Sequence, residues 1–201
     1  MFVMLTLASA LAGEPQKEIL FSTGTSESTG YTSLGVDEFS ELQLSFAYRI
    51  KPDVAAVAAW SMGTIETNYS ISVENAERWN VFQSRFDRHQ LMLGGRYDLP
   101  VASWLRFYGQ LGATAAYNTL LFQDDIESDD PITKQTSSSI QFGGTAGFGF
   151  LGGLEIQENL PVLLFSFELG YSLQSQALLS ENIGTFDLSG RYTRLGVGFA
   201  F

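Results

Sequence analysis

The stretch RYTRLGVGFAF, residues 191–201, decides the fold class. Read backwards from Phe201, every second residue is Phe199, Val197, Leu195 and Thr193, and the residues between them are mostly small or charged. Side chains alternate between the two faces of a β-strand, so this segment predicts a strand with one apolar face. A soluble protein rarely leaves such a strand at its solvent-exposed end. The pattern therefore indicates that something apolar covers it.

The composition is that of a folded, all-β protein. The chain has 201 residues, of which 45% are hydrophobic, and it contains 16 Phe, 8 Tyr and 20 Gly; aromatic residues and glycine are typical of sheets with many strands and turns. The net charge of -11 disfavours a nucleic-acid partner. The absence of cysteine and the presence of a single histidine, His89, exclude a disulfide framework and the common thiolate or multi-histidine metal sites. No cofactor is expected.

The first twelve residues, MFVMLTLASALA, predict a secretory signal peptide. They are apolar and end in small residues that fit a signal-peptidase site, with cleavage near 12/13, which leaves residues 13–201 as a single mature domain. No Lys or Arg precedes the apolar run, so a buried N-terminal strand or helix is the alternative. The later apolar stretches 54–60 and 160–165 are far shorter than the roughly 20 residues of a transmembrane helix.

Seven further segments read as strands. In the segment 38–50, for example, Leu42, Leu44 and Phe46 share one parity and polar residues occupy the other. The parity of 54–70 stays open because alanine dominates both sides. With the C-terminal stretch the count is eight, and the other predicted strands span 17–24, 38–50, 54–70, 88–99, 104–122, 139–150 and 162–174.

Short and long connections alternate along the chain. The short ones are KPD (51–53), LPVAS (99–103) and IQENLP (156–161), and Pro100 is expected to end its strand because proline has no N–H. The long polar ones span about 25–37, 71–87, 123–137 and 178–187. Short turns on one side and long loops on the other are typical of outer-membrane barrels.

The polar face of these strands carries charges among small residues, as the inside of a narrow barrel would. We expect ion pairs there between Glu168 and Arg194 and between Glu18 and Arg49, with Arg96 and Arg106 nearby. The apolar face is aromatic near the strand ends, which suits a membrane interface. The pattern predicts an all-β, eight-stranded, antiparallel, up-and-down transmembrane β-barrel. Side chains fill a barrel of this size, so the charges indicate a plug rather than a pathway.

The whole mature chain resembles the small eight-stranded outer-membrane barrels of Gram-negative bacteria, of the OmpA and OmpX type. The most specific part is the C-terminal strand, where Phe201, Phe199, Val197 and Leu195 match the pattern that the barrel-assembly machinery reads, and Thr193 matches weakly. The resemblance implies an integral outer-membrane location, outer-membrane lipids and lipopolysaccharide as partners, and a monomer.

Two functions of different kinds follow. The leading hypothesis is a non-enzymatic outer-membrane protein, structural or engaged in surface contact through long acidic loops. The alternative is a lipid A acyl hydrolase or acyltransferase that uses His89, as some barrels of this kind do. The histidine-plus-serine pattern of the deacylases is not present, since residue 91 is Leu, and only Ser84 or Ser139 could approach through folding. A soluble lipocalin-like barrel, with its apolar face inward, is a third interpretation.

The loop 123–137 carries five acidic residues, which raises the question of a metal site. A calcium site is one hypothesis, although the loop lacks the glycine and final glutamate of an EF-hand. Shared divalent cations with lipopolysaccharide are a second, and a solvated loop is favoured over both. The acidic residues are Asp124, Asp125, Glu127, Asp129 and Asp130.

Overall fold

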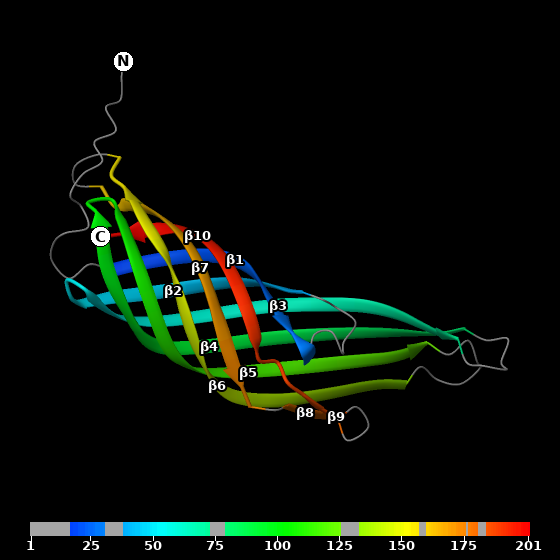
Figure 1. The fold of residues 1–201 in the computed structure, drawn as a ribbon. Helices are drawn as coiled ribbons and strands as arrows, with labels where there is room; N and C mark the ends of the chain where they lie inside the picture. Colours follow the sequence, from blue (N-terminus) through cyan, green and yellow to red (C-terminus); the bar gives the residue numbers. More distant parts are fainter. Residues whose placement is uncertain are drawn as a thin grey trace, which may run out of the picture.

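The structure is a computed structural model that describes residues 17–30, 38–72, 79–125, 133–156, 160–175, 177–180 and 184–201, and no side chain within 67–84, 122–135 or 176–186. Eight of its strands form a closed barrel (Figure 1). The predicted signal peptide lies outside the described residues. The barrel strands are β1 (Lys17–Ser28), β2 (Phe39–Lys51), β3 (Val54–Ser72), β4 (Trp79–Ala102), β5 (Leu105–Asp125), β6 (Thr133–Leu154), β7 (Val162–Gln174) and β10 (Gly190–Ala200).

The barrel closes by pairing of its first and last strands. Every neighbouring pair is antiparallel, and the order around the wall is β1-β10-β7-β6-β5-β4-β3-β2. The backbones of Lys17 and Phe201 exchange two hydrogen bonds at 2.9 and 3.0 Å, which fastens the two ends together. The prediction of a closed eight-stranded antiparallel barrel, in which the C-terminal strand pairs with the weak segment near Ile19 and Phe21, is confirmed.

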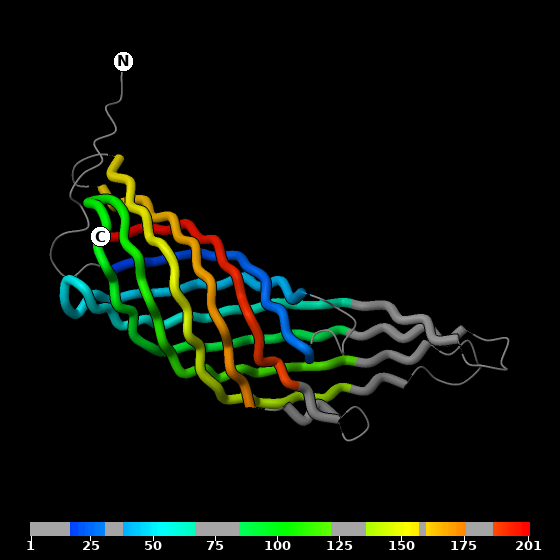
Figure 2. The backbone as a smooth tube through the Cα atoms, in the orientation of Figure 1, coloured from blue at the N-terminus to red at the C-terminus, as the bar shows by residue number. Residues whose placement is uncertain are grey.

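The register shows that the strands are tilted. From Leu20, the paired residues lead through β10 to Leu164 of β7, whereas the path through β2, β3, β4, β5 and β6 leads to Gln174 of the same strand. Such an offset is the stagger that lets a sheet close on itself, and it accompanies a steep tilt of the strands. Figure 2 shows the backbone crossing the wall diagonally.

Alternate residues face opposite sides of the wall, with the apolar set outside. In β10, Leu195 is 60% exposed and Val197 52%, whereas Arg194 is 7% and Ala200 2% exposed. In β3, whose parity the sequence left open, Trp60 and Met62 point outward and Val57 and Ala59 inward. The prediction that the apolar face lies outside is confirmed.

The predicted long loops were wrong in extent. The strands β3, β4, β5 and β6 have 19 to 24 residues, against 11 to 13 in the other four, and they extend well past the rim (Figure 1). Ladder pairing continues to Ser72↔Trp79 and to Asp124↔Thr133. Once a hairpin has left the barrel it needs no alternation of apolar residues to continue its hydrogen-bonded ladder, so the polar sequence concealed these strand ends.

Three other boundaries also differ from prediction. The first strand runs on to Ser28, and the region 178–187 contains the short strands β8 (Ala177–Ser180) and β9 (Gly184–Phe186). Pro100 does not end its strand, which continues to Ala102. An irregularity between Pro100 and Ala102 accommodates the proline at the end of the hairpin, where a missing N–H costs little.

None of the helical residues in the described part of the chain belongs to a segment that is long and apolar enough to cross a bilayer.

Candidate functional site: the interior and the outer wall

A first group of charges lies inside the barrel near the short turns. We call Glu18, Asp98, Arg49, Arg96 and Arg106 the basal cluster. Arg49 Nη2 lies 2.8 Å from Glu18 Oε1 and 3.0 Å from Asp98 Oδ2, and Arg96 binds both carboxylates as well. All five side chains are buried. Since each carboxylate is shared by several guanidinium groups, the cluster ties β1, β2, β4 and β5 together across the interior.

A second group, the central cluster, lies further along the interior and consists of Arg194, Glu41 and Glu168. Arg194 Nη2 lies 2.6 Å from Glu41 Oε1, and its Nη1 lies 3.5 Å from Glu168 Oε1. Glu168 also accepts hydrogen bonds from Tyr108 (2.9 Å) and Gln110 (2.8 Å). The guanidinium stacks 4.0 Å above the ring of Tyr192, so the central cluster blocks the interior with packed side chains.

Only small spaces remain between these groups. A cavity of about 20 Å³ lies between the basal and central clusters, and one of about 10 Å³ lies beyond Arg194, beside Arg88 and Gln90. Each has room for roughly one water molecule. Further along, amides bind one another, as in the 2.9 Å bond from Asn118 to Gln141. Packed charged and amide side chains therefore occupy the interior at several levels among the described residues.

All six charged residues that the sequence singled out face the interior, and the structure brings Glu18 to Arg49 and Glu168 to Arg194. Sequence reasoning missed Glu41 and Asp98. Both stand on the polar parity of their strands, and this signal could have found them. Glu41 is the closer partner of Arg194.

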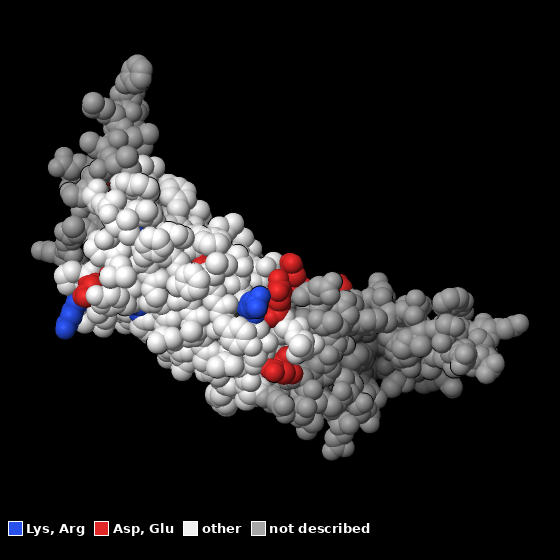
Figure 3. Space-filling view, in the orientation of Figure 1, with Lys and Arg blue, Asp and Glu red and all other residues white. Residues whose placement is uncertain are grey.

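The outer wall of the barrel is apolar. Figure 3 shows an almost uncharged band across the described wall, with charged side chains at both of its ends. Large exposed side chains form the band, and rings gather near the short turns. Exposed residues of this kind cost free energy in water, at about 25 cal/mol per Å² of apolar area. The rings near the short turns are Tyr48, Tyr97, Trp104, Phe107, Phe150, Phe165, Phe199 and Phe201.

His89, the candidate catalytic residue, points outward at the edge of this band that lies nearest the extended strands. Its ring stacks on Trp60 with the centroids 6.2 Å apart, and its register neighbours are Met62 and Tyr117. Ser139 stands on the inward parity of β6, on the other side of the wall, and the side chain of Ser84 lies outside the described residues. The surroundings of His89 are those of an interfacial aromatic group.

Beyond His89 on the same face, Asp87 joins a small polar cluster. It accepts hydrogen bonds from Thr64 Oγ1 (2.7 Å) and Arg85 Nε (2.9 Å). Partial burial alone would raise the pKa of Asp87, but these hydrogen bonds and the charge of Arg85 outweigh burial and hold its pKa below the ordinary value.

The acidic candidates for a metal site fall largely outside the described part of the chain. Asp124 and Asp125 belong to β5, but no side-chain position is described for them, and Glu127, Asp129 and Asp130 are not described. Among the side chains that are described, no group of three metal-binding residues comes together. The calcium hypothesis stays a prediction.

Comparisons with known proteins support the fold. No protein-family model and no curated protein matches the sequence. The fold is similar to that of Ail, the attachment invasion locus protein of Yersinia pestis, in complex with the heparin analogue sucrose octasulfate, with a TM-score of 0.51 and 14% identity over 94% of this chain and 100% of that chain. It is also similar to a major outer membrane protein from Thermus thermophilus, with a TM-score of 0.53 and 12% identity over 92% of this chain and 99% of that chain. The chain thus has the fold of the small outer-membrane barrels.

Proposed function

We propose that the chain is an integral outer-membrane β-barrel protein of a Gram-negative bacterium, with its apolar wall in lipid and its interior closed by side chains. One observation carries the proposal: the closed barrel exposes its large apolar side chains and buries its charges. A lipocalin-like barrel would have the opposite arrangement, because water would drive the apolar face inward. A bilayer favours the observed arrangement, because its hydrocarbon core surrounds the apolar wall. The closed barrel also leaves no unpaired strand edge within the bilayer.

The orientation follows from the lengths of the strands. Outer-membrane barrels keep short turns on the periplasmic side, which here carries the turns at 52–53 and 103–104. The extended ends of β3, β4, β5 and β6 then stand at the cell surface, where lipopolysaccharide surrounds them. Phe201, Phe199, Val197 and Leu195 act as the segment that the assembly machinery reads, and the barrel acts as a monomer.

We assign the extended strands a structural or surface-contact role rather than catalysis. The structure of Ail contains a heparin analogue, which is a polyanion. The net charge of -11 on this chain disfavours a polyanionic partner unless divalent cations bridge the two. A neutral or basic partner fits the charge better.

Cell fractionation and heat-modifiable gel migration test the membrane assignment. The expected result is a protein in the outer-membrane fraction that migrates differently before and after boiling, because the closed barrel resists detergent. Recovery from the soluble fraction would refute it. Mass spectrometry of lipid A, with and without the protein, tests the role: an unchanged number of acyl chains is expected, and a changed number would establish an enzyme.

A further inference from the structure

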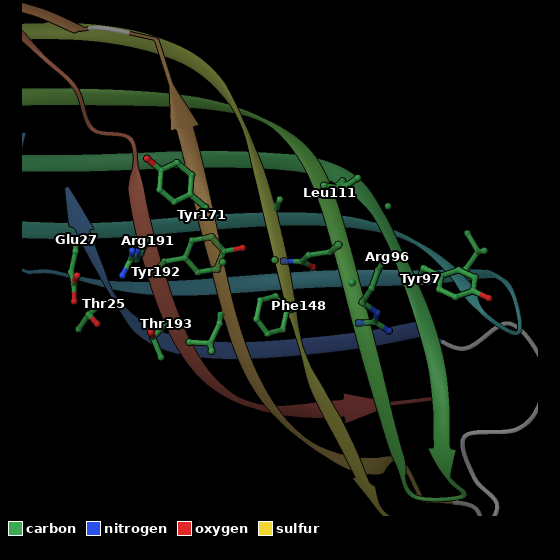
Figure 4. A pocket seen from close by; sticks show the side chains of 18 residues that line it. Thr25, Glu27, Arg96, Tyr97, Leu111, Phe148, Tyr171, Arg191, Tyr192 and Thr193 are labelled. Carbon is green, nitrogen blue, oxygen red and sulfur yellow. The ribbon is translucent and has the colours of Figure 1, made fainter. Parts of the chain in front are cut away.

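A long groove crosses the outer wall of the barrel. Its volume is about 1200 Å³, and it runs from β1 and β10 across β7, β6 and β5 to β4 (Figure 4). A second hollow of about 650 Å³ adjoins it and shares Leu111, Ala146 and Tyr171. The main groove exceeds the roughly 300–1,000 Å³ of a pocket for a drug-sized molecule. A ligand that fills it must be long and largely apolar.

Two outward-facing glycines, Gly95 and Gly109, form the floor of the groove, and packing within the barrel does not require them. A Cβ at Gly95 would lie 3.9 Å from its nearest neighbour, and one at Gly109 would lie 4.0 Å away. The adjacent inward-facing Gly94 differs, because a Cβ there would overlap the backbone of Leu111. Glycine weakens a strand and often marks a place where a ligand approaches the backbone. The two glycines therefore lower the stability of their strands, and a ligand bound in the groove would offset this loss.

One end of the groove is polar and carries both signs of charge. Figure 4 shows Thr25, Glu27, Arg191 and Thr193 together at this end, with Tyr97 and Leu111 at the other. The register places Glu27 opposite Arg191, and both are exposed. Neither forms an ion pair with a residue that the structure describes. The two charges are thus available to a ligand.

We propose that this groove seats one molecule of phosphatidylethanolamine. The acyl chains lie over Gly95, Gly109 and Ala146, the phosphate binds Arg191, and the ammonium binds Glu27. A zwitterionic headgroup complements both charges at the polar end. Unmodified lipid A carries phosphates but no ammonium group, so it offers Glu27 no opposite charge. The inference rests on the proposed membrane location, since it requires the outer wall to lie in lipid.

The polar end of the groove lies on the side of the barrel away from the short turns. Glu27 is near the end of β1, whose start, Lys17, bonds to Phe201, and Arg191 is near the start of β10. In the proposed orientation this is the side that lipopolysaccharide surrounds. Lipid A is therefore the decisive competitor in any test of lipid binding to the groove.

Native mass spectrometry of the full chain tests the proposal. The purified protein, in a mild detergent, is mixed with equal amounts of phosphatidylethanolamine, phosphatidylglycerol and lipid A. We expect one retained phosphatidylethanolamine per barrel as the main adduct. Arg191→Gln should reduce this adduct about tenfold, as expected for the loss of one charge-assisted contact. Glu27→Gln should remove the preference over phosphatidylglycerol and leave lipid binding itself in place.

Variants of the groove floor distinguish a specific lipid-binding site from non-specific binding of lipid all over the outer wall. Gly109→Leu fills the groove and should reduce the adduct about as much as Arg191→Gln. Ala115→Leu is the matched control, because it is an outward position of the same strand that lines neither hollow, and it should change nothing. Each variant is first checked for heat-modifiable migration, and Arg191→Gln, at an exposed site, keeps the test valid if Gly109→Leu fails to fold.

Three outcomes would overturn the inference: equal or greater retention of phosphatidylglycerol or lipid A, an unchanged adduct in both Arg191→Gln and Gly109→Leu, or an equal loss in Ala115→Leu. These outcomes leave the membrane assignment intact if fractionation still places the protein in the outer membrane. A soluble protein would instead refute the proposed function itself.

Discussion

Arg194 is the residue on which the packing of the central cluster depends, because two buried carboxylates share it. We predict that Arg194→Leu lowers the free energy of unfolding by about 3–5 kcal/mol, since Glu41 and Glu168 would remain buried without a cation. Urea unfolding in detergent or lipid, followed by the fluorescence of the exposed Trp60 and Trp104, measures the loss.

Arg85→Leu is the control for this prediction. It breaks an ion pair with Asp87 on the outer surface, where water and salt screen the two charges and the pair contributes little to stability. A loss in Arg194→Leu no larger than in Arg85→Leu would contradict the role of the central cluster. Unchanged stability together with a new conductance would instead make Arg194 a gate.

Asp87 supplies a prediction about pH. Its pKa is lowered in the folded protein, so its interactions stabilise the fold fully above the unfolded pKa of about 3.9 and are lost as the pH falls through the folded pKa. Arg85→Ala should raise the pKa of Asp87 towards the ordinary value. Carbon-13 NMR titration of the carboxyl group measures this, and an unchanged pKa would show that Arg85 is not responsible for the lowered value.

At the residue scale, the sequence predicted which charges lie inside and two of their pairs, but it missed Glu41, the closer partner of Arg194. Parity placed Arg194 and Glu168 on the inner face, and their strands are neighbours in the barrel. Glu41 lies 153 residues from Arg194 along the chain, and the two meet across the interior. Such a contact depends on barrel closure and tilt, which a period of two does not contain.

At the scale of the strand, adjacent glycines have opposite roles. Gly143 faces inward, where a Cβ would overlap the carbonyl oxygen of Leu173, whereas a Cβ at Gly144 would lie 3.5 Å from its nearest neighbour. We predict that Gly143→Ala destabilises the barrel by more than about 1 kcal/mol, because the backbone of β7 must move. Urea unfolding measures the change.

Gly144→Ala is the matched control, one residue away on the same strand. It should be neutral or slightly stabilising, because alanine restricts the unfolded chain more than glycine does. Equal destabilisation by the two variants would show that the close approach of β6 and β7 does not require Gly143.

Strand boundaries were the least predictable elements. Within the barrel, alternation marks a strand because the two sides of the wall differ, and 38–50 corresponds closely to β2. Beyond the rim the alternation is short and weak, because it rests on Tyr69 and Ile71 in β3 and on Trp79 and Val81 in β4, so the sequence did not reveal how far these strands continue. Pro100 failed as a stop signal because the end of a hairpin tolerates it.

For the whole molecule, the proposed filling of the interior by side chains predicts a barrel that does not conduct ions. Two described cavities, of about 20 and 10 Å³, both contact Arg194, and each has room for roughly one water molecule. In planar bilayers the protein should therefore give no steady conductance at the level of a porin. A persistent porin-like conductance in the unmodified protein would contradict the packing of the interior.

The architecture was predictable where it depends on residues that lie close together in the sequence. Period, turn spacing and the apolar C-terminal strand indicated eight strands and a wall that faces lipid. The groove was not predictable, because it joins Gly95 and Gly109, which lie on neighbouring strands, to Arg191, which lies on a distant strand at the other end of the groove. Residues that come onto one surface only when the barrel closes do not form a recognisable pattern in the sequence.

The pairing of β1 with β10 constrains the order of events during folding. Lys17 bonds to Phe201, so the first strand has no partner on one side until residues 190–201 have been synthesised. Any sheet that forms before β10 is in place therefore has two unpaired edges. Contacts so distant in sequence also form slowly. The hydrogen bonds that remove these edges can form only when β10 is available to pair with β1.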